Sequence, residues 1–128
     1  MQFDAATLHR IDAAYEVDIE TTRPDGTTRR TIVWAVVEGG DVYVRSWKGD
    51  RGYWYQAALD RPTDVNLVVV GDRIPVKAVA ATDEHAISRC SNGLSKKYRD
   101  DASLPSMLRA GVLATTIRLE PRSARTES

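Results

Sequence analysis

The sequence predicts a mainly β fold with some helix, in which six strands form an antiparallel barrel and short helices flank it. Short runs of alternating or β-branched residues recur along the chain, and turn sequences rich in Gly, Asp and Pro separate them. Only a few segments have helical periodicity. Because strands that follow one another in hairpins pair antiparallel, a barrel is expected rather than a parallel α/β sheet.

The N-terminal segment is predicted to form a helix followed by a strand. Asp4 is suited to cap a helix that carries apolar side chains at Leu8 and Ile11. Residues 15–20 read Tyr-Glu-Val-Asp-Ile-Glu. This strict alternation of apolar and acidic side chains predicts a half-buried strand.

Two turns frame the second and third predicted strands. The Arg-Pro-Asp-Gly turn at residues 23–26 leads into a strand over residues 28–38. Residues 32–37 of this strand are apolar on both faces, as in a central strand of a barrel. The Gly-Gly-Asp turn at residues 39–41 then leads into a third strand over residues 42–46.

A helix and a further hairpin are predicted in the middle of the chain. The helix covers residues 52–59 and ends before a proline. The hairpin pairs residues 65–70 with residues 73–80 around a Gly-Asp turn. Because Pro75 has no N–H to donate to a neighbouring strand, an edge or a bulge is expected there.

The C-terminal third is predicted to contain two helical segments and the last strand. Asp83 caps the first helix, which the Asn-Gly pair at residues 92–93 is expected to kink or split, since Gly costs ~1 kcal/mol relative to Ala in a helix. A short helical piece around Met107 is expected to end at Gly111. The last strand is assigned to residues 112–119.

Length and composition indicate one domain and exclude several classes of partner. The chain has 128 residues, of which 1–121 are assigned to the barrel domain and the polar residues 122–128 to a disordered tail. The 18 basic and 18 acidic residues cancel, so no net field favours nucleic acid or a membrane surface. No apolar stretch approaches the ~20 residues of a membrane helix.

The sequence predicts neither a disulfide nor a metal site. Cys90 is the only cysteine, which fits a reducing compartment, and without a secretory signal at the N-terminus a cytoplasmic location is expected. Cys90 lies on the apolar face of its predicted helix and is interpreted as a packing residue. His9 and His85 lie far apart, with no ligand at metal-binding spacing. No catalytic residue can be assigned.

The loop after the third predicted strand is a candidate site for an anion. Arg45, Ser46, Lys48 and Arg51 lie within seven residues, and Gly49 allows the backbone to approach a ligand closely. Arg offers bidentate contacts to phosphate oxygens, whereas Lys supplies a point charge. The alternative interpretation is a solvated surface loop.

The tryptophans and the paired arginines extend this candidate site. Trp47 directly precedes the charged loop and is the best candidate for an exposed ring that stacks on a ligand. Trp34 and Trp54 are also candidates, although packing in the core is the simpler interpretation of both. Because side chains alternate along a strand, only one of Arg29 and Arg30 can face a groove, and Arg30 is preferred.

Together these residues resemble the split-barrel flavin- and deazaflavin-binding proteins related to pyridoxamine phosphate oxidase. Within that superfamily they are most similar to the domain of unknown function 2255 group. The resemblance covers roughly residues 5–121. It rests on Arg-Arg-Thr-Ile-Val-Trp at residues 29–34, Val-Tyr-Val-Arg-Ser at 42–46, Trp-Tyr at 54–55, Lys-Tyr at 97–98 and Thr-Thr-Ile-Arg-Leu-Glu-Pro at 115–121.

The resemblance implies a split barrel that forms a homodimer, with FMN or F420 in a groove at the dimer interface. One strand would lie along the flavin ring, and the loop after the following strand would hold the phosphate. The implied ring contacts are Thr31 and the backbone of Ile32, Val33 and Trp34. The implied phosphate contacts are Ser46, Lys48, the Gly49 backbone and Arg51.

Two hypotheses of function remain open, and a third is disfavoured. The first is an oxidoreductase that uses FMN or F420 to transform a small organic molecule. The second is a cofactor-free split barrel that binds or converts a small metabolite without redox chemistry. The third is a platform that stacks single-stranded nucleic acid on aromatic rings such as Tyr43 and Trp47, which the balanced charge argues against.

Overall fold

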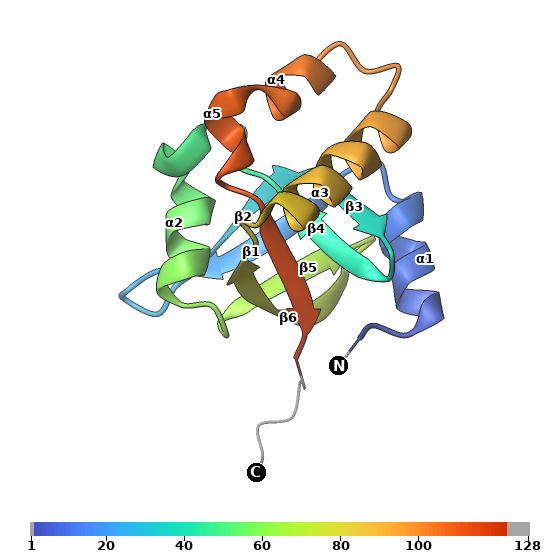
Figure 1. Ribbon diagram of the computed structural model, residues 1–128. Coiled ribbons are helices and arrows are strands. Elements are labelled where there is room, and N and C mark those ends of the chain that lie inside the picture. The colour runs from blue at the N-terminus through green and yellow to red at the C-terminus, as the bar shows by residue number, and fades with distance from the viewer. Residues whose placement is uncertain (1, 123–128) are drawn as a thin grey trace.

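The structure is a computed structural model that describes residues 2–122, and its centre is an antiparallel sheet curled into a half-barrel (Figure 1). The predicted fold class is confirmed, with seven strands rather than six in the described part of the chain. Hairpins join the first strand to the second, the third to the fourth and the fifth to the sixth. The strands are β1 (Val17–Thr22), β2 (Thr28–Val33), β3 (Ala35–Glu38), β4 (Asp41–Val44), β5 (Val65–Val69), β6 (Asp72–Ala80) and β7 (Ile117–Pro121).

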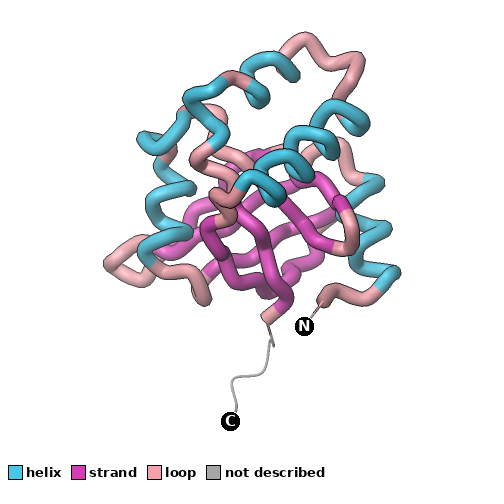
Figure 2. The backbone as a smooth tube through the Cα atoms, in the orientation of Figure 1, coloured by secondary structure: helices cyan, strands magenta, loops and turns pink. Residues whose placement is uncertain are grey.

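Short helices surround the half-barrel (Figure 2). The first and third α-helices begin where the sequence predicts, because Asp4 accepts a hydrogen bond from the Thr7 N–H at 2.7 Å and Asp83 accepts one from the Ala86 N–H at 3.1 Å. None of the helices in residues 2–122 is long and apolar enough to cross a membrane. The helices are α1 (Ala5–Ala13), the 3₁₀ turn η1 (Gly49–Arg51), α2 (Tyr53–Asp60), α3 (Glu84–Lys97), α4 (Leu104–Leu108) and α5 (Ala110–Leu113).

The extra strand arises where the chain passes from one edge of the sheet to the other. The strand order is β2-β1-β5-β6-β7-β4-β3, so β2 and β3 lie at opposite edges although only Trp34 separates them in sequence. The prediction of one strand over residues 28–38 was therefore wrong. The prediction of a central strand at residues 32–37 was also wrong, because the chain bends at Trp34 and Ile32 lies on an edge strand with 64% of its surface exposed.

Apolar side chains form two clusters, one inside the half-barrel and one between its outer face and the helices. Ile19 and Leu67 belong to the inner cluster, together with Trp54 of α2. The outer cluster joins Tyr43 of β4 to Cys90 of α3 and includes residues of α4. The side chains that face inward and outward from β4 are thus both buried, which fixes the register of this strand.

Helix α3 is continuous, contrary to the break expected at residues 92–93. Gly93 is buried where the helix crosses β3, and a Cβ atom there would lie 2.9 Å from Glu38 Cγ and 3.0 Å from Val36 Cβ. Close packing of helix against strand, rather than a kink, therefore explains this glycine.

The C-terminal elements begin later than predicted. The segment around Met107 forms two short helices, α4 and α5, and the second of them contains Val112, so the last strand starts at Ile117 rather than at residue 112. Arg122, assigned to the tail, donates hydrogen bonds to the carbonyl oxygens of Val76 and Val65 at 3.1 and 3.0 Å. The rest of the predicted tail, 123–128, lies outside the described residues.

Pro75 lies inside the sheet, where the neighbouring strand ends. It faces Asn66 of β5, whereas the pairing of β6 with β7 extends only as far as Val76. Pro75 therefore lies just beyond the end of the pairing between β6 and β7, where its lack of an N–H costs no hydrogen bond between strands. This is a local edge of the kind that the sequence predicts.

Candidate functional site

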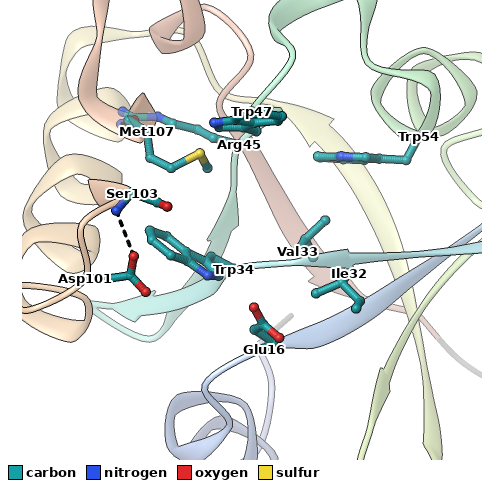
Figure 3. Close-up of a pocket in the computed structure, with 10 residues that line it drawn as sticks. All are labelled: Glu16, Ile32, Val33, Trp34, Arg45, Trp47, Trp54, Asp101, Ser103 and Met107. Atoms are coloured by element: carbon teal, nitrogen blue, oxygen red, sulfur yellow. Dashed lines mark hydrogen bonds between the residues drawn. The ribbon is translucent and has the colours of Figure 1, made fainter. Parts of the chain in front are cut away.

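A pocket of about 300 Å³ lies at the Trp34 bend, between the half-barrel and the segment that joins α3 to α4 (Figure 3). Its walls come from five separate stretches of the sequence. These are the approach to β1, the β2 end, the β4 end with the following loop, α2, and the segment from Asp101 into α4. The lining residues are Glu16, Ile32, Val33, Trp34, Arg45, Trp47, Trp54, Asp101, Ser103 and Met107.

All three tryptophans of the chain line this pocket. Trp47 is 58% exposed, as expected for a ring available to a ligand, whereas Trp54 is only 6% exposed and packs in the inner cluster. Trp34 packs against the outer cluster, so it is both a packing residue and a wall of the pocket. Figure 3 shows Trp47 and Trp54 nearly edge-on, with Trp34 and Ile32 on the opposite side of the pocket.

A stack of aromatic rings holds Trp34 in place. Its ring lies parallel to that of Tyr98, with centroids 3.9 Å apart, and Tyr15 meets the Tyr98 ring edge-on at 5.1 Å. The Tyr98 hydroxyl donates to the Tyr15 carbonyl oxygen at 2.7 Å. One face of Trp34 is therefore occupied by the protein itself.

Two carboxylates, Glu16 and Asp101, line the same pocket. The Tyr15 hydroxyl donates a hydrogen bond to Asp101, and the Ser103 N–H donates another at 2.8 Å. The bond from Tyr15 lowers the pKa of Asp101 and raises the pKa of Tyr15 to about 12. Asp101 is therefore negatively charged at neutral pH.

Arg45 is almost completely buried in the pocket wall, with 1% of its surface exposed. Its guanidinium donates to Thr116 Oγ1 at 2.8 Å, to the Met107 carbonyl at 3.1 Å and to the Ile87 carbonyl at 2.9 Å. Burial lowers the pKa of this side chain. Arg45 thus ties α3, α4 and the segment before β7 together, and all three acceptors are neutral.

The loop after Arg45 separates into a buried and an exposed part. Ser46 is buried, and its Oγ has no hydrogen-bond partner within residues 2–122. Lys48 and Arg51 are exposed, and neither forms an ion pair in the described part of the chain. Gly49 lies between them with a φ of +71°, a conformation that favours glycine.

Arg109, which the sequence did not single out, also contacts this loop. Its Nη2 donates to the Trp47 carbonyl at 2.6 Å, and its Nη1 donates to the Ser106 carbonyl. The side chain itself is exposed. Arg109 therefore adds a third cation beside Lys48 and Arg51.

The structure does not bring Arg30 and Thr31 into the pocket lining. Arg30 Nε pairs with Glu20 Oε2 at 3.1 Å, and Arg73 contacts the same buried carboxylate. Thr31 is half-buried and lies opposite Ile19 of β1. The guanidinium of Arg29 lies over the Tyr53 ring, 4.5 Å from its centroid.

The remaining candidates behave as packing residues or surface groups. Cys90 is buried, and this burial raises the pKa of its thiol to about 11. No group of three or more potential metal ligands occurs in residues 2–122. Tyr43 is only 1% exposed, so it cannot stack on a nucleic-acid base as the disfavoured hypothesis requires.

Four lining residues were missed by the sequence analysis. Glu16 was interpreted only as a solvent-facing member of an alternating strand. Asp101, Ser103 and Met107 lie in or near a connection between helices, with no motif to mark them. They reach the pocket only because α3 carries the chain back over the Trp34 bend.

The half-barrel and its covering helices also occur in solved structures of other proteins. The sequence matches the family described as "Uncharacterized protein conserved in bacteria (DUF2255)" over residues 7–119. The chain belongs to this family. No protein with a curated description matches the sequence.

Solved structures that share this fold include proteins described in different terms. ChuZ from Campylobacter jejuni is similar with a TM-score of 0.73 and 10% identity, over 91% of this chain and 51% of ChuZ, so this chain spans about half the length of ChuZ. HutZ, a haem storage protein from Vibrio cholerae, is similar with a TM-score of 0.66 and 9% identity, over 97% of this chain and 93% of HutZ. An F420-H2-dependent reductase, FDR-A, has a TM-score of 0.61 and 20% identity, over 83% and 94% of the two chains. At these identities the likeness shows the fold alone.

Proposed function

We propose that this protein binds a flavin-type cofactor, FMN or F420, at an interface between two copies of the chain, and acts as an oxidoreductase on a small organic molecule. The observation that carries the proposal is that an aromatic pocket lies beside a basic loop whose Lys48 and Arg51 form no ion pair within residues 2–122. Trp47 lines the pocket and is bonded directly to Lys48, the first cation of that loop. This arrangement suits a ligand with a flat aromatic head and an anionic tail.

The residues present fit such a ligand. Lys48 and Arg51 are exposed and, among the described residues, have no acidic partner, so they can neutralise a phosphate, and Gly49 allows its oxygens to approach the backbone. Ile32 and Trp47 offer exposed apolar surface to a ring. Because β2 is an edge strand, alternate N–H and C=O groups along it are unpaired and available to hydrogen-bond the ring. When bound, the cofactor supplies hydride transfer, and the chain orients it and shields it from water.

The size and position of the pocket favour a site shared by two copies. A volume of about 300 Å³ is at the lower end of the range for small-molecule sites, ~300–1,000 Å³. A cofactor and a substrate together need more room than this. Ile32 and Trp47 line the pocket and are exposed, so a second copy packed against them would enlarge the pocket and cover apolar surface.

The alternative is a cofactor-free split barrel that binds or converts a metabolite. Trp54 favours it, because this ring is buried and already occupies part of the groove. The stacking of Trp34 on Tyr98 likewise uses one ring face that a cofactor would otherwise contact. The exposed ring of Trp47 and the exposed cations of the loop, Lys48 and Arg51, favour the cofactor-binding proposal over this alternative.

The test is an absorbance spectrum of freshly purified protein, followed by thermal melts with FMN and with F420. A bound flavin band near ~450 nm, or a melt raised by several degrees with either cofactor, would support the proposal through binding linkage. Size-exclusion chromatography with light scattering would measure the mass in solution. A colourless protein whose melt neither cofactor changes would contradict the proposal and favour the alternative.

A charge variant with a matched control makes the test specific to the loop. Lys48→Ala/Arg51→Ala is expected to weaken cofactor binding by at least about tenfold, because two charge-assisted contacts to phosphate are lost. Lys77→Ala/Arg99→Ala removes the same charge from exposed positions outside the pocket lining. Equal weakening by both pairs would show only a general charge effect.

A further inference from the structure

The pocket has an acidic side opposite its exposed tryptophan. Glu16 and Asp101 both line it, and in Figure 3 they lie across the pocket from Trp47 and Trp54. Within residues 2–122 neither carboxylate forms an ion pair with a cationic side chain. No cation of these residues neutralises either charge, and the partners of Asp101, the Tyr15 hydroxyl and the Ser103 N–H, are both uncharged donors.

The aromatic side of the pocket borders the same space. In Figure 3 the indole of Trp47 is seen nearly edge-on across the pocket from Glu16. This ring is 58% exposed, whereas Trp54 is 6% exposed and adds an apolar wall. Tryptophan is the aromatic residue that attracts a cation most strongly, because the face of its ring is electron-rich. The exposed indole of Trp47 on one side and the carboxylates of Glu16 and Asp101 on the other form the two halves of a cage for a positive charge.

One cation already lines the pocket, and its charge is directed into the protein. The guanidinium of Arg45 donates to the carbonyl oxygens of Met107 and Ile87 and to the hydroxyl of Thr116, at 2.8 to 3.1 Å. The side chain is buried in the wall. The pocket lining therefore carries two negative charges and one positive charge. The two carboxylates lie on the side of the pocket away from Arg45.

We propose that the substrate of this pocket is a small organic cation, in which a compact or flat apolar group bears a positively charged nitrogen. The apolar group would lie against the exposed ring of Trp47, with the charge turned toward Glu16 and Asp101. This inference deepens the proposed function and rests on it, because the basic loop is then taken by the phosphate of the cofactor. The substrate and the cofactor tail would occupy regions of opposite charge.

Three probes that share one phenyl ring test the sign of the charge. They are benzyltrimethylammonium, benzyl alcohol and phenylacetate, which are positive, neutral and negative. Each is titrated into the cofactor-free full chain by calorimetry and by intrinsic fluorescence, which reports on this pocket because all three tryptophans line it. The cation is expected to bind about tenfold or more tighter than the alcohol, and the anion most weakly. Equal binding of all three, tightest binding of phenylacetate, or no binding at all would overturn the inference.

Variants that remove a carboxylate charge or the indole of Trp47 test whether the cationic probe binds in this pocket. Glu16→Gln and Asp101→Asn are each expected to weaken benzyltrimethylammonium about threefold or more while leaving benzyl alcohol unchanged. Trp47→Ala should weaken the cation about tenfold. Glu84→Gln, an exposed carboxylate outside the pocket lining, is the matched control. Cation binding that Glu16→Gln, Asp101→Asn and Trp47→Ala all leave intact would place the site elsewhere and refute the inference.

Separate cofactor measurements distinguish failure of this inference from failure of the proposed function. Cofactor binding is followed by the flavin or F420 spectrum, and probe binding is followed by calorimetry. A protein that binds FMN or F420 but shows no preference for the cation would retain the proposed function and lose this inference. A protein that binds the cation and neither cofactor would instead be a cofactor-free binding protein.

Discussion

The contact between Ser46 and Gly52 gives a sharp test of how the basic loop is built. A Cβ atom at Gly52 would lie 2.2 Å from Ser46 Oγ and 3.3 Å from the Gly49 carbonyl oxygen. The φ of Gly52 is −59°, which alanine also adopts, so a substitution there tests space rather than backbone strain. The glycine is therefore expected to be required because the serine hydroxyl occupies the space where a side chain would be.

The expected magnitudes follow from these contacts. Gly52→Ala should destabilise the fold by about 1–3 kcal/mol, the usual cost of overpacking. Ser46→Ala should leave stability unchanged or raise it by up to about 1 kcal/mol, because Ser46 Oγ is buried with no partner in the described residues. Removing the hydroxyl first should recover about 1–2 kcal/mol of the cost of Gly52→Ala. The Gly49 carbonyl would account for the remainder.

Urea unfolding of the four proteins in this double-mutant cycle measures the coupling between the two positions. The fluorescence of the tryptophans reports the transition, and linear extrapolation gives the free energies of unfolding. Gly111→Ala is the control, since a Cβ atom there has no neighbouring heavy atom within 4 Å. If Gly52→Ala costs the same with and without the serine hydroxyl, the steric explanation is wrong. If Ser46→Ala alone costs more than about 1 kcal/mol, the hydroxyl has a partner and the interpretation of it as unpaired is refuted.

Three further predictions concern α3. Burial lowers the pKa of Lys97 to about 8 from 10.5, so between these pH values the unfolded chain binds more protons than the folded chain. The free energy of unfolding of the native chain, measured relative to that of Lys97→Met, should therefore rise as the pH increases from about 8 to 10.5. Urea titrations that show no change in this difference with pH would contradict the prediction. Gly93→Ala should lower stability by about 1 kcal/mol, because crowding against Val36 exceeds the gain in helix propensity; a higher melting temperature would refute it. Burial raises the pKa of Cys90 to about 11, so iodoacetamide should modify it at pH ~8 only after unfolding, as mass spectrometry would show.

The parts of the fold that depend on neighbours in sequence were predicted correctly. Asp4 and Asp83 cap helices through hydrogen bonds that span three residues. The turn at residues 23–26 contains Gly26 with a φ of +89°, which glycine adopts at little cost. The exposure of Trp47 also followed from its place before a charged loop. In each case the interaction that decides the structure lies within a few residues.

The errors occurred where distant segments decide the outcome. The run of apolar residues from 32 to 37 has the pattern of a buried central strand, but the bend at Trp34 divides it between the two edges of the sheet. Gly93 has the properties of a helix breaker, yet its neighbour β3 makes it a point of close packing. A hydrophobic pattern indicates that a segment carries apolar surface, without showing which neighbour covers it, and Ile32 of this run is 64% exposed.

The candidate site divides in the same way. The residues on its basic side are evident from the sequence, because Arg45, Trp47, Lys48 and Arg51 lie within seven residues of one another. The packing of the helices makes Arg45 turn inward, while Lys48 and Arg51 remain exposed and without ion pairs in residues 2–122. The carbonyl oxygens that hold Arg45 come from two different helices, and no local pattern encodes their position.

The acidic side of the pocket depends on tertiary structure alone. Glu16 and Asp101 are 85 positions apart in the sequence, and they line one pocket because α3 returns the chain over the bend at Trp34. Local propensities and periodicities set the strands, turns and helix caps, since these arise from contacts between near neighbours. The pocket arises from the packing of α3 and the connection that follows it against the half-barrel. That packing joins residues far apart in the chain, so the charge and shape of the site are properties of the assembled fold.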